Sequence, residues 1–149
     1  MAVRRGVGVG LIFACLAGFV LAADKPEDAA QAAGESWLSV VDAGDYAGSW
    51  DQAAKVLKGA VRQDDWVQMS SGLRTPLGKL VSRRLRSREY TEKPPTTRLV
   101  GGKVYTWGQG RYVVLHYDAA FANKPSAVET VTMMADPDGV WRVSGYSIA

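Results

Sequence analysis

Apolar and polar side chains alternate near the C-terminal end of the chain, on both sides of a strong turn signal. The turn is Asp136–Gly139, in which Pro137 sets the φ angle of a type I turn and the final glycine supplies the left-handed residue that closes a three-residue loop. With this loop, Ala135 faces Trp141 across the two strands. The pattern therefore predicts an antiparallel hairpin over residues 127–148.

The same register divides the hairpin into two faces, because successive side chains of a strand point to opposite sides. One face carries Glu129, Val131, Met133, Ala135, Trp141 and Val143. The other face carries Thr130, Thr132, Met134, Arg142, Ser144 and Tyr146. We expect the first face to be buried and the second to be solvated, since a slip of one residue would mix the two sets. Glu129 is the exception, a carboxylate on the face that is predicted to be buried.

Three stretches in the first half of the chain repeat apolar residues at helical spacing. The first begins at Pro26 and is ended by Gly44, the second covers residues 46–57, and the third covers residues 66–73 and ends at Thr75-Pro76. Aspartates that could cap the second and third helices are Asp45 and Asp64. The sequence predicts three N-terminal helices.

The second half of the chain changes from helical to strand periodicity. Residues 80–91 and 111–121 alternate as strands do, and residues 104–107 predict a short edge strand inside the irregular segment 93–109. Helices followed by antiparallel strands are typical of an α+β domain in which the helices group on one face of the sheet.

The N-terminal segment predicts a secretory signal peptide over residues 1–22. Arg4 and Arg5 precede an uncharged apolar run, and small residues at Val20-Leu21-Ala22 suit cleavage near Ala22. The alternative is an uncleaved signal that serves as a membrane anchor, although the apolar run is short for a span. We expect a periplasmic or secreted protein whose single domain covers residues 23–149.

Cleavage changes the chemistry of the chain, because it removes its only cysteine, Cys15. The mature chain could then form no disulfide, and cysteine-attached haem is excluded. Losing Arg4 and Arg5 leaves 16 of the 18 basic side chains against 15 acidic ones, a net charge of +1. A charge this small gives no reason to expect a nucleic-acid partner.

Glu129 is the strongest single candidate for chemistry. A carboxylate on an apolar face suits a general base, whereas pairing with an inward arginine such as Arg74 would make it a structural link between helix and sheet. One histidine, His116, is expected on the polar face of its strand. No metal site is predicted, because catalytic zinc needs several His, Cys or carboxylate ligands at matched spacing. No cofactor is predicted either.

Two further groups of residues suggest binding. An aromatic pocket is predicted around Trp50, Tyr117 and Glu129, although aromatic residues at such spacing are often plain core. The Arg83–Arg88 segment predicts an arginine row, with Arg84, Arg86 and Arg88 sharing one strand face by alternation. One interpretation is that this row binds an anionic partner. The alternative is a solvent-exposed sheet face whose charges discourage pairing with another strand.

Three segments resemble a bacterial family known as domain of unknown function number 4019. They are DAGDYAGSWDQAA at residues 42–54, RTPLGKLVSRRL at 74–85 and the segment from Tyr112 to Ile148. The resemblance implies exported domains of the nuclear-transport-factor-2-like, cone-shaped kind, with a curved sheet wrapped by helices and a pocket at the open end. It implies no catalytic residues. The chain departs from the family pattern at residues 93–109, where a short loop would be expected.

These observations leave three functional hypotheses. The leading one is an exported, non-enzymatic binding or interaction module for a small apolar ligand or an envelope protein, because no complete catalytic set is recognisable. The second is an isomerase- or dehydratase-like enzyme with Glu129 as general base. The third is an electrostatic binder of anionic envelope components through the Arg83–Arg88 row. Direct membrane contact is expected only through an uncleaved signal. The sequence leaves the oligomeric state open.

Overall fold

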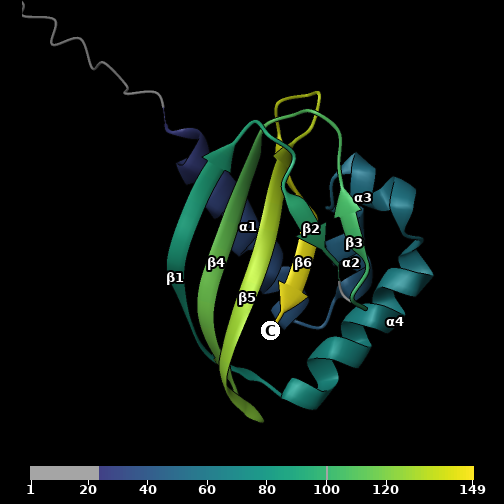
Figure 1. Cartoon of the computed structure of the whole chain (residues 1–149). Helices are drawn as coiled ribbons and strands as arrows, with labels where there is room; N and C mark the ends of the chain where they lie inside the picture. The colour runs from purple at the N-terminus through teal and green to yellow at the C-terminus, as the bar shows by residue number, and fades with distance from the viewer. Residues whose placement is uncertain (1–23, 100) are drawn as a thin grey trace, which may run out of the picture.

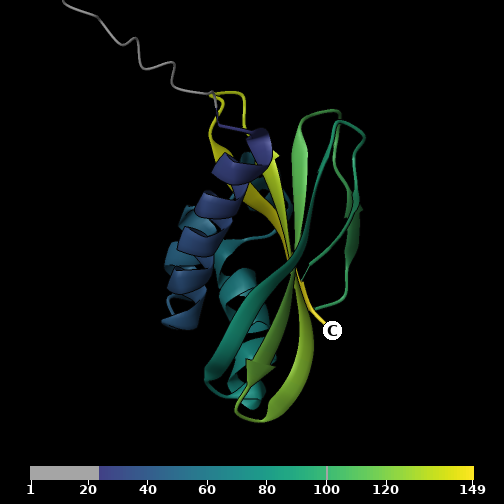
Figure 2. The same cartoon turned by 90° about the vertical axis from the view of Figure 1, so that its left-hand side faces the viewer.

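The computed structural model describes residues 24–99 and 101–149, so the predicted signal peptide lies outside the described residues. Helices cover one face of a four-stranded antiparallel sheet, and a small second sheet lies against the other face (Figures 1 and 2). This is the predicted α+β arrangement, and Figure 2 shows the curvature of the sheet. The sheet does not close into a barrel. Membership of the cone-shaped, nuclear-transport-factor-2-like superfamily stays a prediction. In the described part of the chain, no helix is both long and apolar enough to cross a membrane.

The first helices begin and end as their sequence predicts. Helix α1 spans Pro26–Asp42 with proline in its first turn, and Gly44 follows with a φ of 78°. Helix α2 spans Tyr46–Asp51, and the Asp45 carboxylate accepts a hydrogen bond from the Gly48 N–H at 2.8 Å. The predicted cap of this helix is confirmed.

The second predicted helix is wrong in its length, because the chain leaves the helical path at Ala53 and Ala54. Both alanines are fully buried, and the Ala54 N–H donates to the Val143 carbonyl of the sheet at 2.8 Å. A hydrogen bond to the sheet thus replaces one within the helix, and a separate helix α3 spans Lys55–Ala60. Residues 24–99 therefore contain four α-helices where the sequence predicted three.

The last helix starts earlier than its predicted cap. Helix α4 spans Gln63–Arg74, so Asp64 lies in its first turn, where a negative charge still complements the helix dipole. A 3₁₀ turn at Thr75–Leu77 follows and leads into the sheet. The predicted end of this helix, before Pro76, is confirmed.

The main sheet has the strand order β1-β4-β5-β6. Its strands are β1 Leu80–Thr91, β4 Tyr112–Phe121, β5 Lys124–Ala135 and β6 Trp141–Ile148. At the β5–β6 turn, the Asp136 N–H donates to the Val140 carbonyl at 3.0 Å, and Gly139 has a φ of 79°. Ala135 pairs with Trp141, as predicted.

A β-bulge changes the register further from this turn. Met133 pairs with Val143, but Thr132 pairs with Gly145, so Ser144 is an extra residue in β6. In β6, the side chains beyond the bulge therefore point to the faces opposite from those predicted. Tyr146 lies fully buried on the helix-facing side. The prediction of Tyr146 on the solvated face is wrong for this reason.

The segment 93–109 forms a second antiparallel hairpin, made of β2 (Thr96–Arg98) and β3 (Val104–Thr106). It packs over β6 at Gly145, where a Cβ atom would overlap the Thr97 side chain. The predicted edge strand therefore exists, but it pairs with β2 and does not extend the main sheet.

The hydrophobic core lies between the helices and the main sheet. Trp37 of α1 makes an edge-on contact with Tyr146 at a ring distance of 5.2 Å and packs against Trp66 of α4. Val143 is buried and Trp141 is half-buried against the same core, which confirms that this face of the hairpin points to the helices near the turn. The opposite face is not solvated as expected, because Thr132 and Ser144 are buried where β2 packs over β6.

Candidate functional site

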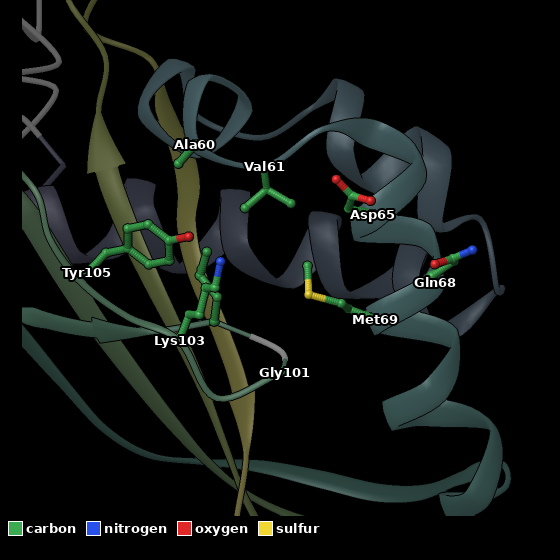
Figure 3. Close-up of a pocket in the computed structure, with 9 residues that line it drawn as sticks. Ala60, Val61, Asp65, Gln68, Met69, Gly101, Lys103 and Tyr105 are labelled. Carbon is green, nitrogen blue, oxygen red and sulfur yellow. The ribbon is translucent and has the colours of Figure 1, made fainter.

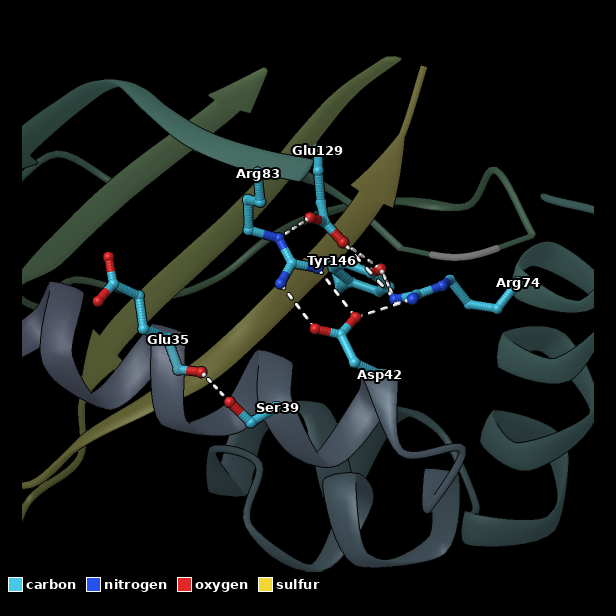
Figure 4. A network of polar contacts seen from close by, with 7 residues as sticks. All are labelled: Glu35, Ser39, Asp42, Arg74, Arg83, Glu129 and Tyr146. Atoms are coloured by element: carbon cyan, nitrogen blue, oxygen red, sulfur yellow. Dashed lines mark hydrogen bonds and ion pairs between the residues drawn. The ribbon is translucent and has the colours of Figure 1, made fainter. Parts of the chain in front are cut away.

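A cluster of charged side chains, buried at its centre and open to solvent at Asp42, lies where the C-terminal ends of α1 and α4 meet the sheet (Figure 4). At its centre, Glu129 of β5 is fully buried. One carboxylate oxygen accepts a hydrogen bond from Arg83 Nε at 2.5 Å, and the other accepts one from the Tyr146 hydroxyl at 2.6 Å. Arg74 Nη1 lies 3.7 Å from Glu129 Oε1. Both oxygens of the carboxylate are therefore engaged.

Asp42, the last residue of α1, closes the cluster on the helix side. Its Oδ1 accepts from Arg74 Nη2 at 2.8 Å, and its Oδ2 accepts from Arg83 Nη1 at 2.7 Å. Burial alone would raise the pKa of Asp42, but the hydrogen bonds from the two guanidinium groups outweigh burial and lower it. Two arginines thus face two carboxylates, and the cluster has no excess of either charge.

Tyr146 links the two arginine–carboxylate pairs. Its hydroxyl accepts a hydrogen bond from Arg74 Nη1 at 3.0 Å while it donates to Glu129. Burial and the neighbouring Glu129 carboxylate raise the pKa of Tyr146 well above its ordinary value, so the hydroxyl stays protonated at neutral pH. The cluster joins α1, α4, β1, β5 and β6 through its side chains.

This geometry matches the structural alternative for Glu129 more closely than the catalytic one. A general base needs a free lone pair within hydrogen-bond reach of a substrate proton. The Glu129 oxygens are held instead by groups of the protein itself, and none of its surface reaches solvent. The predicted link to Arg74 is present, together with a second and closer arginine, Arg83.

The three residues of the predicted aromatic pocket are only partly brought together. Tyr117 and Glu129 are direct neighbours across β4 and β5, and the buried Tyr117 hydroxyl has no hydrogen-bond partner within the described residues. The Trp50 indole N–H donates elsewhere, to the Val61 carbonyl at 2.8 Å. These three side chains line none of four cavities in the described part of the structure.

The predicted arginine row is divided between the two faces of the sheet. A bulge between Leu85 and Ser87 breaks the alternation of β1. Arg84 and Arg86 bond to Asp118 on the outer face, whereas Arg88 reaches the helix side, where its Nη1 donates to Asp28 at 2.6 Å. The shared face expected for Arg84, Arg86 and Arg88 is therefore wrong, while their binding of an anion stays a prediction.

A pocket that opens to solvent lies between the helices and the β2–β3 hairpin (Figure 3). Its volume is about 290 Å³. One side is formed by the end of α3 and by α4, and the other by the hairpin. Its lining residues are Ala60, Val61, Asp65, Gln68, Met69, Leu99, Gly101, Lys103 and Tyr105. The lining combines apolar side chains with the Gln68 amide, the Tyr105 hydroxyl, one carboxylate and one ammonium group.

Three other cavities lie elsewhere on the described structure, and two of them lie against charged groups that are already paired. One of about 550 Å³ lies beside the charged cluster, where Asp42 and Arg74 reach its wall. One of about 260 Å³ lies between α1 and the β5–β6 turn, with Trp37 and Met133 in its lining. One of about 270 Å³ lies on the outer face of the sheet beside Asp118. Among residues 24–99 and 101–149, no cluster of three or more His, Cys or acidic side chains could hold a metal ion.

Sequence reasoning missed Arg83, Asp42 and Tyr146 as members of the buried cluster. Arg83 was expected in the arginine row, Asp42 had no predicted role, and Tyr146 was predicted on the opposite face. The odd position of Glu129 on an apolar face was the one signal available, because a buried carboxylate requires partners of opposite charge. The pocket had no comparable signal, since two of its walls come from elements far apart in sequence.

Comparisons with known proteins identify a family for the chain but no activity. No curated protein matches the chain, and no solved structure matches it. A family model described as "Protein of unknown function (DUF4019)" matches residues 33–146, which include the charged cluster and the open pocket. Since the match covers most of the chain, the protein belongs to the DUF4019 family of proteins of unknown function.

Proposed function

We propose that the protein is an exported binding module, and that the pocket between α4 and the β2–β3 hairpin is its ligand site. The observation that carries this proposal is the contrast between the two candidate places. The buried carboxylate Glu129 is fully occupied by Arg83 and Tyr146, whereas the pocket lined by Met69 and Tyr105 is open to solvent.

The lining of the pocket suits a small apolar group that carries polar atoms at one end. Val61 and Leu99 belong to the hydrophobic core, and Met69 packs against that core, so this part of the pocket is apolar and well supported. Asp65 and Lys103 carry opposite charges in the lining. A volume of about 290 Å³ is near the lower end of ligand pockets, which hold roughly 300–1,000 Å³.

The binding site can be tested by NMR with methyl-labelled methionine and N-acetyl-leucinamide as the probe. Met69 lines the pocket, whereas Met133 lines the cavity between α1 and the β5–β6 turn. We expect the Met69 methyl resonance to shift in a saturable way and that of Met133 to stay unchanged. A response at Met133 alone, or at neither methyl group, would contradict the proposed site.

Two tryptophan variants provide a matched control. Ala60 is exposed and lines the pocket, so Ala60→Trp fills the space without removing a core side chain. The neighbouring Gly59 has open space around it and is not among the lining residues, so Gly59→Trp adds the same indole beside the pocket. The probe should lose its effect on Met69 in Ala60→Trp and keep it in Gly59→Trp. Equal responses in the two variants would count against the pocket.

Export is supported by the sequence of residues 1–22. N-terminal sequencing of the protein recovered from the periplasm or medium should begin at Ala23, and Ala22→Arg should leave a longer, cell-associated chain. Recovery of the intact chain from the cytoplasm in both cases would remove export from the proposal and leave the binding site unaffected.

A further inference from the structure

The second strand of the small hairpin has a free edge. The Leu99 N–H donates to the Lys103 carbonyl at 2.9 Å, which makes these residues a hydrogen-bonded pair. Alternate pairs of an antiparallel ladder are bonded, so Thr97 and Tyr105 form the next bonded pair. The N–H and C=O groups of Val104 therefore point away from β2, as do those of Thr106. In the part of the chain that the structure describes, no strand pairs with this edge.

The two edges of the main sheet are protected. Strand β1 carries charged side chains and two bulges along its edge, and both features discourage strand addition. Outward groups of β6 are used within the molecule, since the Val143 carbonyl accepts from Ala54 and the Ser144 carbonyl accepts from the Trp107 indole at 3.0 Å. The edge of β3 has neither protection, and Val104 is 52 % exposed.

The free edge lies beside the pocket. The flanking Lys103 and the β3 residue Tyr105 line the pocket together with Met69 of α4, and Figure 1 draws β3 between β2 and α4. Figure 3 shows Tyr105 and Lys103 on one side of the space and Met69 and Gln68 of α4 on the other. Backbone hydrogen-bonding groups and an apolar recess thus lie next to each other, which is the combination that recognises an extended peptide.

We propose that the β3 edge and this pocket together bind an extended peptide segment of a partner protein, which adds a strand to β3 and places one apolar side chain in the pocket. This inference rests on the proposed binding function. The volume of about 290 Å³ suits a side chain better than a whole peptide, so the peptide backbone would lie along Val104–Thr106. Asp65 and Lys103 would bond to polar groups that flank the apolar side chain.

The test uses two proline variants that are matched across the hairpin. Val104 and Arg98 pair directly, and their N–H groups point to opposite edges. Val104→Pro removes an N–H from the free edge of β3, whereas Arg98→Pro disturbs the same hairpin and leaves that edge intact. Twelve-residue peptides are selected from a random displayed library against the purified protein, and their affinity is then measured for both variants and for Ala60→Trp.

We expect Val104→Pro to weaken peptide binding by about tenfold and Arg98→Pro to change it much less, because the lost contact is a backbone hydrogen bond at the binding edge. N-methylation along the selected peptide should weaken binding at every second amide, as strand pairing requires. Equal effects of the two prolines, an N-methylation profile without alternation, or a library that yields no binder would each overturn the proposal.

Two outcomes separate this inference from the proposed function. If selected peptides are blocked by Ala60→Trp but unaffected by Val104→Pro, the pocket binds ligands and strand addition is wrong. If the N-acetyl-leucinamide test fails while the proline and N-methylation results hold, the edge binds peptides and the pocket assignment is wrong.

If the free protein forms a dimer that Val104→Pro dissociates, the occupant is a second copy of this chain, and the proposal of a partner peptide is overturned.

Discussion

The substitution Glu129→Gln tests whether the buried cluster stabilises the fold. The amide keeps the size of the side chain and one acceptor oxygen, but it replaces the other oxygen by a donor that faces Arg83 or Tyr146. It also leaves the buried Arg74 and the half-buried Arg83 opposite the single carboxylate of Asp42. Breaking a buried ion pair costs about 3–5 kcal/mol, and since the amide keeps part of the hydrogen bonding we expect about 3 kcal/mol.

That loss is a large part of the total, because domains are stable by only about 5–15 kcal/mol. At roughly 3–5 °C per kcal/mol for a domain of this size, the melting temperature should fall by about 10–15 °C. Thermal and urea unfolding followed by circular dichroism measure this change. The control is Asp118→Asn, which removes the solvent-exposed pairs with Arg84 and Arg86 and should leave the melting temperature nearly unchanged.

The result also separates the structural role of Glu129 from the catalytic one. A general base contributes to turnover, so an enzyme would lose activity in Glu129→Gln while the melting temperature stays nearly unchanged. A structural cluster gives the opposite result. If Glu129→Gln melts within about 2 °C of the unmodified protein while Asp118→Asn behaves as expected, the reasoning about the buried ion pairs is refuted.

Three further predictions concern the packing and charges around the sheet. Tyr117→Phe should raise stability by about 1 kcal/mol in urea unfolding, because it removes a buried hydroxyl that has no partner among the described residues; a loss of stability would show that the hydroxyl is satisfied. Gly145→Ala should cost about 1–3 kcal/mol by overlap with Thr97, and Thr97→Ser should restore part of it, since the Thr97 methyl is the nearest atom; additive losses in a double-mutant cycle would contradict this packing. The hydrogen bonds from Arg142 and from a backbone N–H lower the pKa of Asp138 from its usual 3.8 to about 2. The Asp138 carboxylate therefore contributes stability above pH 3.8 that is lost as the pH falls towards 2, and Asp138→Asn should flatten the pH dependence of the melting temperature in that window. An unchanged acid profile would contradict the lowered pKa.

Local signals account for the parts of the fold that the sequence predicted well. The turn at Asp136–Gly139 and the glycine after α1 each depend on a backbone conformation that only a few residue types adopt easily. The alternation along β4 and β5 follows directly from burial of one sheet face. These features need no knowledge of distant contacts, which explains why the sequence predicted them.

The features that the sequence did not predict all depend on contacts between distant segments. The second predicted helix is interrupted because Ala54 donates to Val143, 89 residues further along the chain. Bulges in β1 and β6 turn Arg88 and Tyr146 to the side opposite from that given by simple alternation. One extra residue in a strand changes the facing of every residue beyond it, so a pattern with period two fails after the bulge.

The bulge in β6 also affects what fills the space between the helices and the sheet, because it turns Tyr146 to the helix-facing side. The resemblance in sequence implies a pocket at the open end of the curved sheet. Between the sheet and the helices, Arg83, Glu129 and Tyr146 fill part of the space with groups that bond to each other. The open pocket instead has the β2–β3 hairpin as one wall, and this hairpin lies in the segment 93–109 that departs from the family pattern. Thr97 and Leu99 of this segment are buried, so the hairpin is anchored to the domain. An anchored wall needs little ordering when a ligand binds, and the short edge of β3 can therefore contribute useful affinity despite its length.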